Sequence, residues 1–282
     1  MGGMGTAPVA EPASLDRLRA ELRRLGRVVV AFSGGADSAF LAWVAHDTLG
    51  PAGAHAVTAV SPSLAPGEEA DARALAAEWG LRWTPVATAE MDAPAYLANG
   101  GDRCFHCKSA LMDAAAPLAA AEGATVVLGT NLDDLGDHRP GQEAARARGA
   151  SFPLVEAGFT KAAVRDWSRR LGLRTWDKPA AACLASRIPY GTPVTVAVLS
   201  GVARAEAALR RLGFAQVRVR HYGETARVEV DLDDLARVVD RRRAVVAAVR
   251  AAGYRYVTLD LEGFRSGNLN GALRAPSPEE SS

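Results

Sequence analysis

A short apolar run that leads directly into a glycine- and serine-rich loop constrains this chain more than any other feature. Residues 27–32 read RVVVAF, and residues 33–38, SGGADS, follow without a gap before a helical pattern over 39–49. A β-branched run of this kind is typical of a buried strand in a parallel sheet. Because parallel sheets are covered by helices on both faces, the segment predicts a layered α/β fold.

Strand and helix patterns alternate through the first two thirds of the chain. We expect strands at 27–32, 54–60, 82–86 and within 125–131, and helices at 15–25, 39–49, 66–80 and 109–121. Ser14 can cap the first helix and Gly26 ends it. An irregular stretch carries the motif CFHC before the helix at 109–121. The alternation predicts a doubly wound parallel sheet.

The pattern changes near residues 190–193, where we place a domain boundary. The sequence then predicts a smaller C-terminal α+β domain, with a helix at 197–211, strands at 216–221 and 226–230, a helix at 232–251 and a strand at 255–261. The expected organisation is a flexible tail over 1–13, the α/β domain over 14–191, the α+β domain over 192–273 and a disordered tail over 274–282.

Composition restricts the classes of partner. The 33 basic and 32 acidic residues give a formal net charge of +1, whereas proteins that bind nucleic acid usually carry a basic excess. No apolar run approaches the ~18 residues of a membrane-spanning helix, and the N-terminus lacks the basic start and apolar stretch of a secretory signal. Three cysteines also fit a reducing compartment. We therefore expect a cytoplasmic protein with neither a membrane nor a nucleic-acid partner.

The loop after the first strand has the chemistry of a phosphate site. Gly34 and Gly35 allow backbone angles that point successive N–H groups into one concavity, and the following helix adds partial positive charge. The hydroxyls of Ser33 and Ser38 can donate to phosphate oxygens, and Asp37 can hold Mg²⁺. The loop lacks a Walker lysine. The sequence predicts a pyrophosphate site, and the alternative is a tight turn with a helix cap.

Other segments could complete this site. Gly129, Thr130 and Asn131 follow a strand directly and can reach a nucleotide at the carboxyl edge of the sheet. Lys161 begins a predicted helix and is one of three lysines among the 33 basic residues, which favours phosphate contact. A second metal site or a solvated turn could involve Asp133, Asp134 and Asp137.

Three arginines could bind an anionic substrate. Arg187 lies four residues after Cys183, and Arg218 and Arg220 alternate along a predicted strand, so that both lie on one face. In a chain so rich in arginine, each could also be a solvated surface residue.

The cysteines suggest sulfur or metal chemistry. Cys104 and Cys107 form a CxxC motif, whose spacing lets two thiolates reach one metal or cluster, and the fold can add the distant Cys183. Three thiolates on a [4Fe–4S] cluster leave one iron open to hold a sulfide, and this cluster is our first expectation. The alternatives are a thiol or persulfide relay, a zinc site completed by His106 or His138, and inert buried cysteines. Cys183 could instead give up its own sulfur.

Five motifs together resemble a known family. The loop resembles the SGGxDS signature of the PP-loop ATP pyrophosphatases, whose fold is the adenine nucleotide α-hydrolase type. With RCFHCKSAL, LGTNLDDLGDHRPG, DKPAAACLASRIPYGTPVT and DLEGFRSGNLN, the chain resembles the LarE-type sulfur transferases from about residue 14 to residue 273. These enzymes take part in the synthesis of the nickel-pincer nucleotide.

The resemblance implies an activity and assigns roles. ATP and Mg²⁺ bind at the loop, the carboxylates of a small nucleotide, pyridinium-3,5-biscarboxylate mononucleotide, are adenylated, and sulfur replaces oxygen. The sulfur-bearing position is Cys183, and Cys104 with Cys107 places the chain among members that hold a [4Fe–4S] cluster. A homo-oligomer is also implied by the family.

Two other functions remain open from sequence. A PP-loop tRNA thiolase would also use cysteines or a cluster, but it predicts steeply salt-dependent tRNA binding, which the balanced charge disfavours. A non-catalytic nucleotide sensor would keep the loop and release no pyrophosphate. A related synthase that uses ammonia would have no use for three cysteines.

Overall fold

The protein forms two compact units, each assembled from separate stretches of the chain. The computed structural model describes residues 13–135, 140–179 and 182–265. The first unit comprises residues 1–59, 68–87 and 108–181, and the second comprises 60–67, 88–107 and 182–282. The expected boundary near residue 191 would divide the chain only once. The expected tails at 1–13 and 274–282 lie outside the described residues, except for Ala13.

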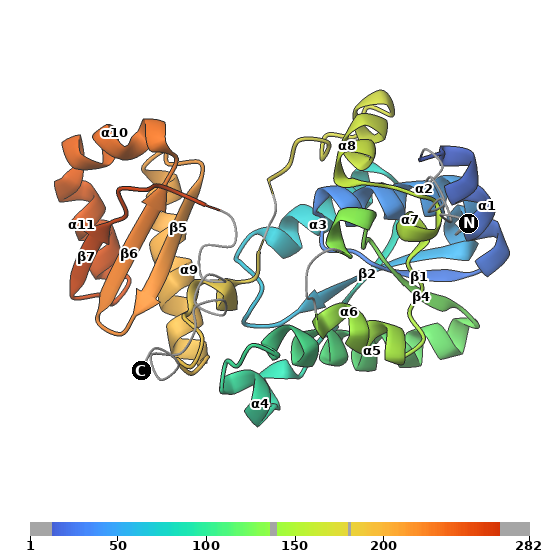
Figure 1. Ribbon diagram of the computed structural model, residues 1–282, viewed down its shortest axis with the longest axis horizontal. Helices are drawn as coiled ribbons and strands as arrows, with labels where there is room; N and C mark the ends of the chain where they lie inside the picture. The colour runs from blue at the N-terminus through green and yellow to red at the C-terminus, as the bar shows by residue number, and fades with distance from the viewer. Residues whose placement is uncertain (1–12, 136–139, 180–181, 266–282) are drawn as a thin grey trace, which may run out of the picture. The chain divides into compact units, whose positions relative to one another are not determined.

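A four-stranded sheet forms the centre of the first unit (Figure 1). Its strands are β1 (Val28–Ala31), β2 (Ala54–Val60), β3 (Arg82–Ala87) and β4 (Thr125–Leu128). The order is β3-β2-β1-β4, and β1 runs parallel to both β2 and β4. The chain therefore reverses its direction of winding between β1 and β4, and the loops that follow these two strands emerge at one edge. Open α/β sheets bind ligands at such a point.

Helices cover both faces of this sheet. They are α1 (Leu15–Leu25), α2 (Ala36–Gly53), α3 (Glu68–Glu78), α5 (Arg103–Glu122), α6 (Pro140–Ala147), α7 (Pro153–Glu156) and α8 (Lys161–Arg170). Val28 and Val30 of β1 pack into one apolar core with α1, α2, α3 and α8, whereas Val29 packs into another with Met112 of α5 and Ala145 of α6. Successive side chains of a strand point to opposite faces, so the doubly wound sheet is confirmed (Figure 1).

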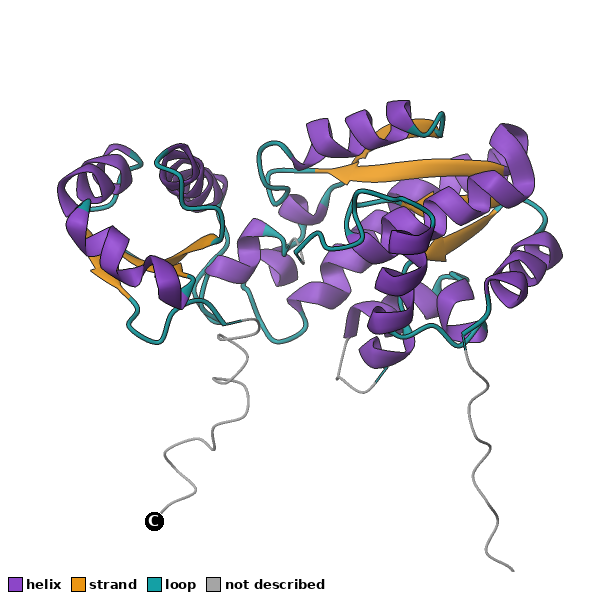
Figure 2. Ribbon diagram, turned by 90° about the horizontal axis from the view of Figure 1, so that it is seen from above, coloured by secondary structure: helices purple, strands orange, loops and turns teal. Residues whose placement is uncertain are grey.

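The second unit contains a three-stranded sheet with the order β5-β6-β7 (Figure 1). Figure 2 shows strands in orange and helices in purple. The elements of this unit are β5 (Val217–Tyr222), β6 (Thr225–Val230), β7 (Tyr256–Leu259), α4 (Pro94–Leu97), α9 (Val196–Arg211), α10 (Leu235–Asp240) and α11 (Arg242–Ala251), with the 3₁₀ turns η1 (Glu90–Asp92), η3 (Leu184–Arg187) and η4 (Leu232–Asp234). β5 and β6 form the expected hairpin, and β7 runs parallel to β6. Val217 and Val219 pack with Leu199 of α9. The C-terminal α+β prediction is confirmed.

One difference from the expected elements concerns the CxxC motif. The helix expected from residue 109 begins at Arg103, so CFHC is helical and not irregular. The N–H groups of Phe105 and His106 donate to the carbonyl oxygen of Asp102, at 2.7 and 3.4 Å, and so form the first turn. The prediction was wrong because this turn lacks an apolar periodicity of its own.

Two further differences are local. The helix expected over 232–251 is divided into η4, α10 and α11, with a break at Arg241, whose guanidinium donates to the carbonyl oxygen of Leu212. Ser14 occupies the N-cap position of α1 without a capping hydrogen bond from its side chain, whereas Gly26 ends the helix at φ +76°, as expected. No helix in the described ranges is both long and apolar enough to cross a membrane.

Candidate functional site

The loop between β1 and α2 has a backbone conformation that suits anion binding. Gly34 has φ +70°, a left-handed conformation that costs a side-chain-bearing residue about 1–2 kcal/mol. Gly35 is the N-cap of α2, and no side chain caps the first turn. The leading N–H groups of this helix are therefore available to an acceptor, as a phosphate site requires.

The two serines of the loop bond to each other. The Ser33 and Ser38 hydroxyl oxygens lie 3.0 Å apart, the Ser33 N–H donates to Ser38 Oγ at 3.2 Å, and Ser38 Oγ donates to the Gly35 carbonyl oxygen at 3.2 Å. Ser38 is buried and Ser33 is exposed. In the protein alone these hydroxyls shape the loop, and their donation to phosphate oxygens stays a prediction.

Gly129 lets the loop after β4 pass close to the start of α2. A Cβ atom at this position would lie 2.8 Å from the Ser38 nitrogen and 2.9 Å from the Ser38 Cα. Both atoms belong to the backbone of a helix and cannot rotate away. Glycine is therefore required here by close approach, and any side chain would displace the β4 loop or the phosphate loop.

We expect Gly129→Ala to weaken ATP binding at least about tenfold and to lower the free energy of unfolding by roughly 1–3 kcal/mol, the usual range for overpacking. Isothermal titration calorimetry and urea denaturation measure the two effects. The control is Gly201→Ala in α9, where the nearest atom to an added Cβ is 3.5 Å away. It should retain ATP affinity and be as stable as the wild type or more stable. Equal ATP affinity and equal stability of the two variants would contradict the conclusion that Gly129 is required by its close approach to Ser38.

Asp37 is joined to the loop after β4 by a hydrogen bond. Its Oδ1 accepts from Asn131 Nδ2 at 3.1 Å. Asn131 is fully buried and caps the 3₁₀ turn η2 (Leu132–Asp134): its Oδ1 accepts from the Asp133 N–H at 3.0 Å, and its own N–H donates to Asp134 Oδ2 at 3.2 Å. The ends of β1 and β4 therefore share one polar network.

Lys161 completes this network and begins α8 as expected. Its ammonium lies 3.0 Å from Asp134 Oδ1, and its backbone N–H donates to Asp133 Oδ2 at 2.7 Å. The sequence did not decide between a metal site and a solvated turn for Asp134, although the spacing of Asn131 and Asp134 is that of a capping box.

Two other residues that could bind a metal, Asp137 and His138, lie outside the described residues. In the described part of the chain, no three His, Cys, Asp or Glu side chains are grouped closely enough to hold a metal ion.

Burial and a neighbouring carboxylate disfavour the charged form of Asp37. Burial, and then the neighbouring Asp134 carboxylate, raise the pKa of Asp37 above its ordinary value, against the opposing effects of Asn131, Lys161 and Arg165. An anion in such a place gains more from a divalent cation than a solvated carboxylate does. The residues present therefore fit Mg²⁺.

All three cysteines lie in the second unit. Cys104 and Cys107 are three residues apart at the start of α5, on one side of the helix, and Cys183 is the N-cap residue of η3. Cys104 and Cys183 are exposed, and Cys107 is half-buried.

Two tyrosines connect these thiols electrostatically. Burial raises the pKa of Tyr96, and Cys183 and Cys107 raise it further; burial also raises the pKa of Tyr190, with contributions from Cys104 and Cys183. Each tyrosine is therefore affected by two of the three thiols, but in the described residues the three thiols are not grouped closely enough to hold a metal ion. Sequence reasoning missed both tyrosines: Tyr96 precedes the CxxC motif and Tyr190 follows Cys183, and neither segment has an evident periodicity.

Two of the three expected anion-binding arginines are paired with buried carboxylates. Arg187 donates to Glu206 at 2.8 and 3.2 Å, and Arg220 donates to Glu229 at 3.0 and 2.7 Å. All four side chains are buried. Burial by itself would raise the pKa of Glu206, but the bonds and charge of Arg187 hold it below its ordinary value. Substrate binding by Arg187 and Arg220 stays a prediction.

Arg218 is in a different position. Its guanidinium lies over the Phe264 ring, 5.1 Å from the ring centre. Burial, and then the positive charge of Arg187, lower the pKa of Arg218 to about 10. Arg218 Nη1 also donates to the Val217 carbonyl oxygen at 3.0 Å. Substrate binding by Arg218 likewise stays a prediction.

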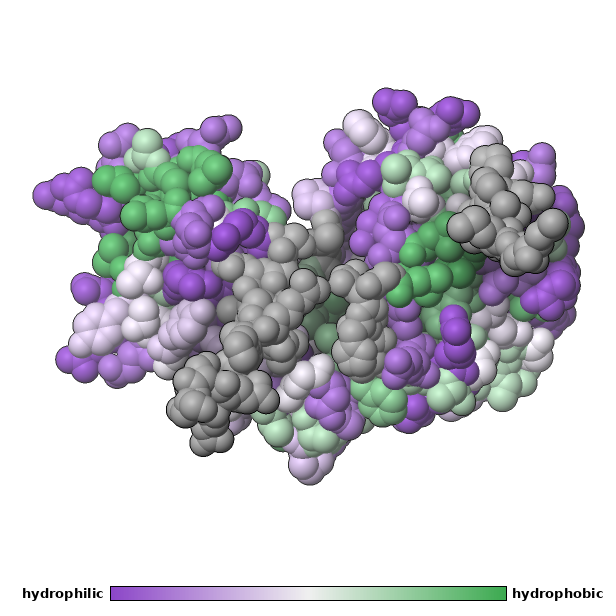
Figure 3. Space-filling view, viewed as in Figure 1, coloured by the Kyte–Doolittle hydropathy of each residue, from purple (hydrophilic) through white to green (hydrophobic). Residues whose placement is uncertain are grey.

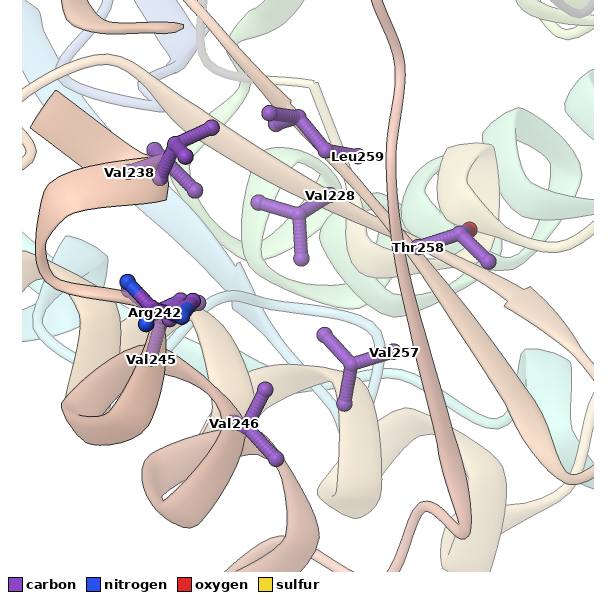
Figure 4. A pocket seen from close by; sticks show the side chains of 9 residues that line it. Val228, Val238, Arg242, Val245, Val246, Val257, Thr258 and Leu259 are labelled. Carbon is purple, nitrogen blue, oxygen red and sulfur yellow. The ribbon is translucent and has the colours of Figure 1, made fainter. Parts of the chain in front are cut away.

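The second unit also has an apolar groove away from these residues. Figure 4 shows it between β6, β7, α10 and α11, lined by Val228, Val238, Val245, Val257 and Leu259, with Arg242 at its edge. The hydrophobic surface on this part of the unit is visible in Figure 3. The lining includes none of the predicted site residues, and we assign it no catalytic role.

A phosphate loop at the winding reversal of a parallel sheet, with Asp37 and Lys161 at the same edge, defines a nucleotide-binding protein of the PP-loop class. Comparison with known families agrees, because residues 13–99 match the NAD synthase family. The chain is 47% identical over 264 residues to an uncharacterized protein of Synechocystis sp. strain PCC 6803, covering 93% of this chain and 98% of that protein.

A second relative gives the particular family. The chain is 37% identical over 257 residues to the pyridinium-3,5-bisthiocarboxylic acid mononucleotide synthase of Lactiplantibacillus plantarum, covering 91% of this chain and 93% of the synthase. It belongs to the family of that synthase, the LarE-type sulfur transferases. An uncharacterized protein of Methanocaldococcus jannaschii is 25% identical over 171 residues, which is 60% of this chain and 67% of that protein.

Proposed function

We propose that the protein is an ATP-dependent sulfur transferase that converts the carboxylates of pyridinium-3,5-biscarboxylate mononucleotide into thiocarboxylates. The near full-length match to a synthase named for the bisthiocarboxylic acid product supports this most strongly. The polar network of Asp37, Asn131, Asp134 and Lys161 supports it independently, because it supplies charges of both signs beside a phosphate loop.

In the first step a substrate carboxylate oxygen attacks the α-phosphorus of ATP, the bond to the β-phosphate oxygen breaks, and pyrophosphate leaves. The N–H groups of the loop and of the start of α2 hold the leaving pyrophosphate. Asp37 would hold Mg²⁺, which when bound would supply positive charge to the pyrophosphate, and Lys161 would contact a phosphate oxygen. Gly129, Thr130 and Asn131 are proposed to line the nucleotide at the end of β4. Arg187, Arg218 and Arg220 remain the proposed residues for binding the anionic substrate.

In the second step a sulfur nucleophile attacks the acyl carbon of the adenylate, and AMP leaves with the electron pair of the broken carbon–oxygen bond. Cys183 is the sulfur-bearing position. Cys104, Cys107 and Cys183 would hold a [4Fe–4S] cluster, because thiolates are its usual ligands and three of them leave one iron open. When bound, such a cluster would supply a sulfide for transfer. Over the described ranges the three thiols are not grouped closely enough to hold a metal ion, so this part of the proposal rests on the ligand chemistry of the thiolates and on the family relationship.

Metal and sulfide analysis of anaerobically purified protein tests the sulfur source. We expect about four iron atoms per chain, as the cluster requires, and acid-labile sulfide, together with a Cys183 whose mass is unchanged after turnover. Cys104→Ala should lose the iron and repeated turnover, whereas Ser109→Ala, a similar truncation in the same helix, should keep both.

The outcomes separate the hypotheses. Absence of iron together with unchanged turnover by Cys104→Ala would exclude the cluster, and a Cys183 that has lost its sulfur would identify that residue as a sacrificial donor. Failure to form thiocarboxylate with ATP and the biscarboxylate nucleotide would overturn the proposed function itself. We also propose a cytoplasmic homo-oligomer, and light scattering of the purified protein tests the oligomer.

A further inference from the structure

We propose that Arg103 is a positioning residue that fixes the helix of Cys104 and Cys107 to the turn of Cys183. The reason for holding these segments together rests on the proposed function, in which the three thiols act together. The contacts of Arg103 are observed independently of that function. Arg103 is the first residue of α5 and precedes Cys104 directly. It is 5% exposed, which is unusual for an arginine.

The guanidinium joins two segments that are far apart in sequence. Arg103 Nη1 donates to Asn99 Oδ1 at 2.5 Å and to the carbonyl oxygen of Ala185 at 2.9 Å. Ala185 lies two residues after Cys183, in η3. The guanidinium carbon also lies 5.3 Å from the centre of the Tyr190 ring. These contacts fix the start of α5 against the residues that follow Cys183.

Asn99 strengthens the same connection from the segment before α5. It is fully buried and has φ +57°, a conformation in which asparagine is enriched. Its Nδ2 donates to the carbonyl oxygens of Pro189 and Thr192, at 2.8 Å each, and its own carbonyl accepts from the Gly191 N–H at 3.1 Å. The Asn99–Arg103 pair therefore holds the chain from Ala185 to Thr192.

The turn of Cys183 is fixed on its other sides as well. Arg187 Nη1 donates to the carbonyl oxygens of Ala182 and Cys183, at 2.6 and 3.0 Å, and Arg220 Nη1 donates to that of Ser186 at 2.9 Å. These two arginines are fixed in turn by buried carboxylates. The turn is therefore rigid, and the Arg103 bond sets where the CxxC helix lies relative to it.

Cross-linking of the metal-free protein measures this placement. A bifunctional thiol reagent, dibromobimane, is applied, and the trypsin fragments are identified by mass spectrometry. Cys104 and Cys107 lie on one fragment and Cys183 lies on another, so the two kinds of cross-link are separable. The bridge between Cys104 and Cys107 is an internal control, because it lies within one helix.

We expect Arg103→Ala to lower the fraction of Cys183 cross-linked to the CxxC pair roughly tenfold, since small misplacements of reacting groups have large effects on rate. The Cys104–Cys107 bridge should be unchanged. Arg103→Lys should recover most of the Cys183 cross-link, because one ammonium can donate to both acceptors. The control is Arg204→Ala, which removes similar bonds to the Ala252 carbonyl oxygen and to Ser200, and it should behave as the wild type.

An Arg103→Ala variant that melts and cross-links like the wild type would overturn the proposal. Should that variant fail to fold, Arg103→Met decides in its place, because methionine keeps an apolar stem of similar length and removes the donors to Asn99 and Ala185. A normal Cys183 cross-link in Arg103→Met would likewise overturn it. The assay requires neither ATP nor substrate, so loss of the proposed transferase function cannot be mistaken for failure of this inference.

Discussion

Replacement of Asp37 by Asn is expected to reduce ATP-dependent pyrophosphate release at least about 100-fold, because a magnesium ligand loses its charge. Asparagine keeps the shape of the side chain and an oxygen that can accept a hydrogen bond from Asn131. The expected fall in activity therefore comes from the loss of the negative charge. Pyrophosphate is measured by a coupled assay with ATP, Mg²⁺ and the biscarboxylate nucleotide. Asp166→Asn, which changes an exposed carboxylate of α8, is the control and should release pyrophosphate at the wild-type rate.

The same substitution should make the nucleotide-free protein more stable. Burial and Asp134 raise the pKa of Asp37 in the folded state, so folding disfavours its charged form. This penalty is absent below the pKa of an unfolded carboxyl and is complete above the raised folded value. The Tm of Asp37→Asn should therefore exceed that of the wild type at pH 7, with a difference that shrinks as the pH falls. Normal pyrophosphate release by Asp37→Asn would contradict the assignment of Asp37 to the nucleotide site.

Cys183→Ala is expected to abolish thiocarboxylate formation, by at least about 1000-fold as for other essential catalytic groups, while substrate-dependent pyrophosphate release stays within about threefold. A ligand of the proposed cluster is lost, but the phosphate site of the first unit keeps all its residues. Mass spectrometry of the product and the pyrophosphate assay separate the two steps.

Ser186→Ala is the matched control for this experiment. Ser186 belongs to the same turn, and its hydroxyl donates to the Cys183 carbonyl oxygen at 2.7 Å. The control should form the thiocarboxylate normally. Continued sulfur transfer by Cys183→Ala would assign the sulfur-bearing position to another residue, and loss of pyrophosphate release would give Cys183 a part in adenylation.

Local patterns were sufficient to predict the sheet and its phosphate loop. The run at 27–32 is buried on both faces of a parallel sheet, and such burial leaves a continuous β-branched signature in one segment. Gly34 and Gly129 were predicted as site residues, and a left-handed backbone at the first and close approach at the second explain the glycines. Lys161 was expected at a helix start, and its position follows from the Thr160 cap.

Pairings between residues that are far apart in the chain could not be predicted from the sequence. Arg187 and Glu206 are 19 residues apart, and Arg103 and Ala185 are 82 apart. A single sequence does not show which of many arginines meets which carboxylate or carbonyl, because that depends on the packing of separate elements. The helical start of α5 was missed because its first turn lacks an apolar periodicity of its own. The dipeptide Asn99–Gly100 is a turn signal that could have pointed to the positive φ of Asn99.

The turn of Cys183 is defined by bonds to its backbone. Arg103, Arg187 and Arg220 hold its carbonyl oxygens, and the Leu184 N–H donates to the Ser63 carbonyl oxygen at 2.9 Å. Among the described residues, none of these bonds involves the thiol. Because the turn is held through its backbone, a chemical change at the Cys183 sulfur leaves every one of these bonds in place.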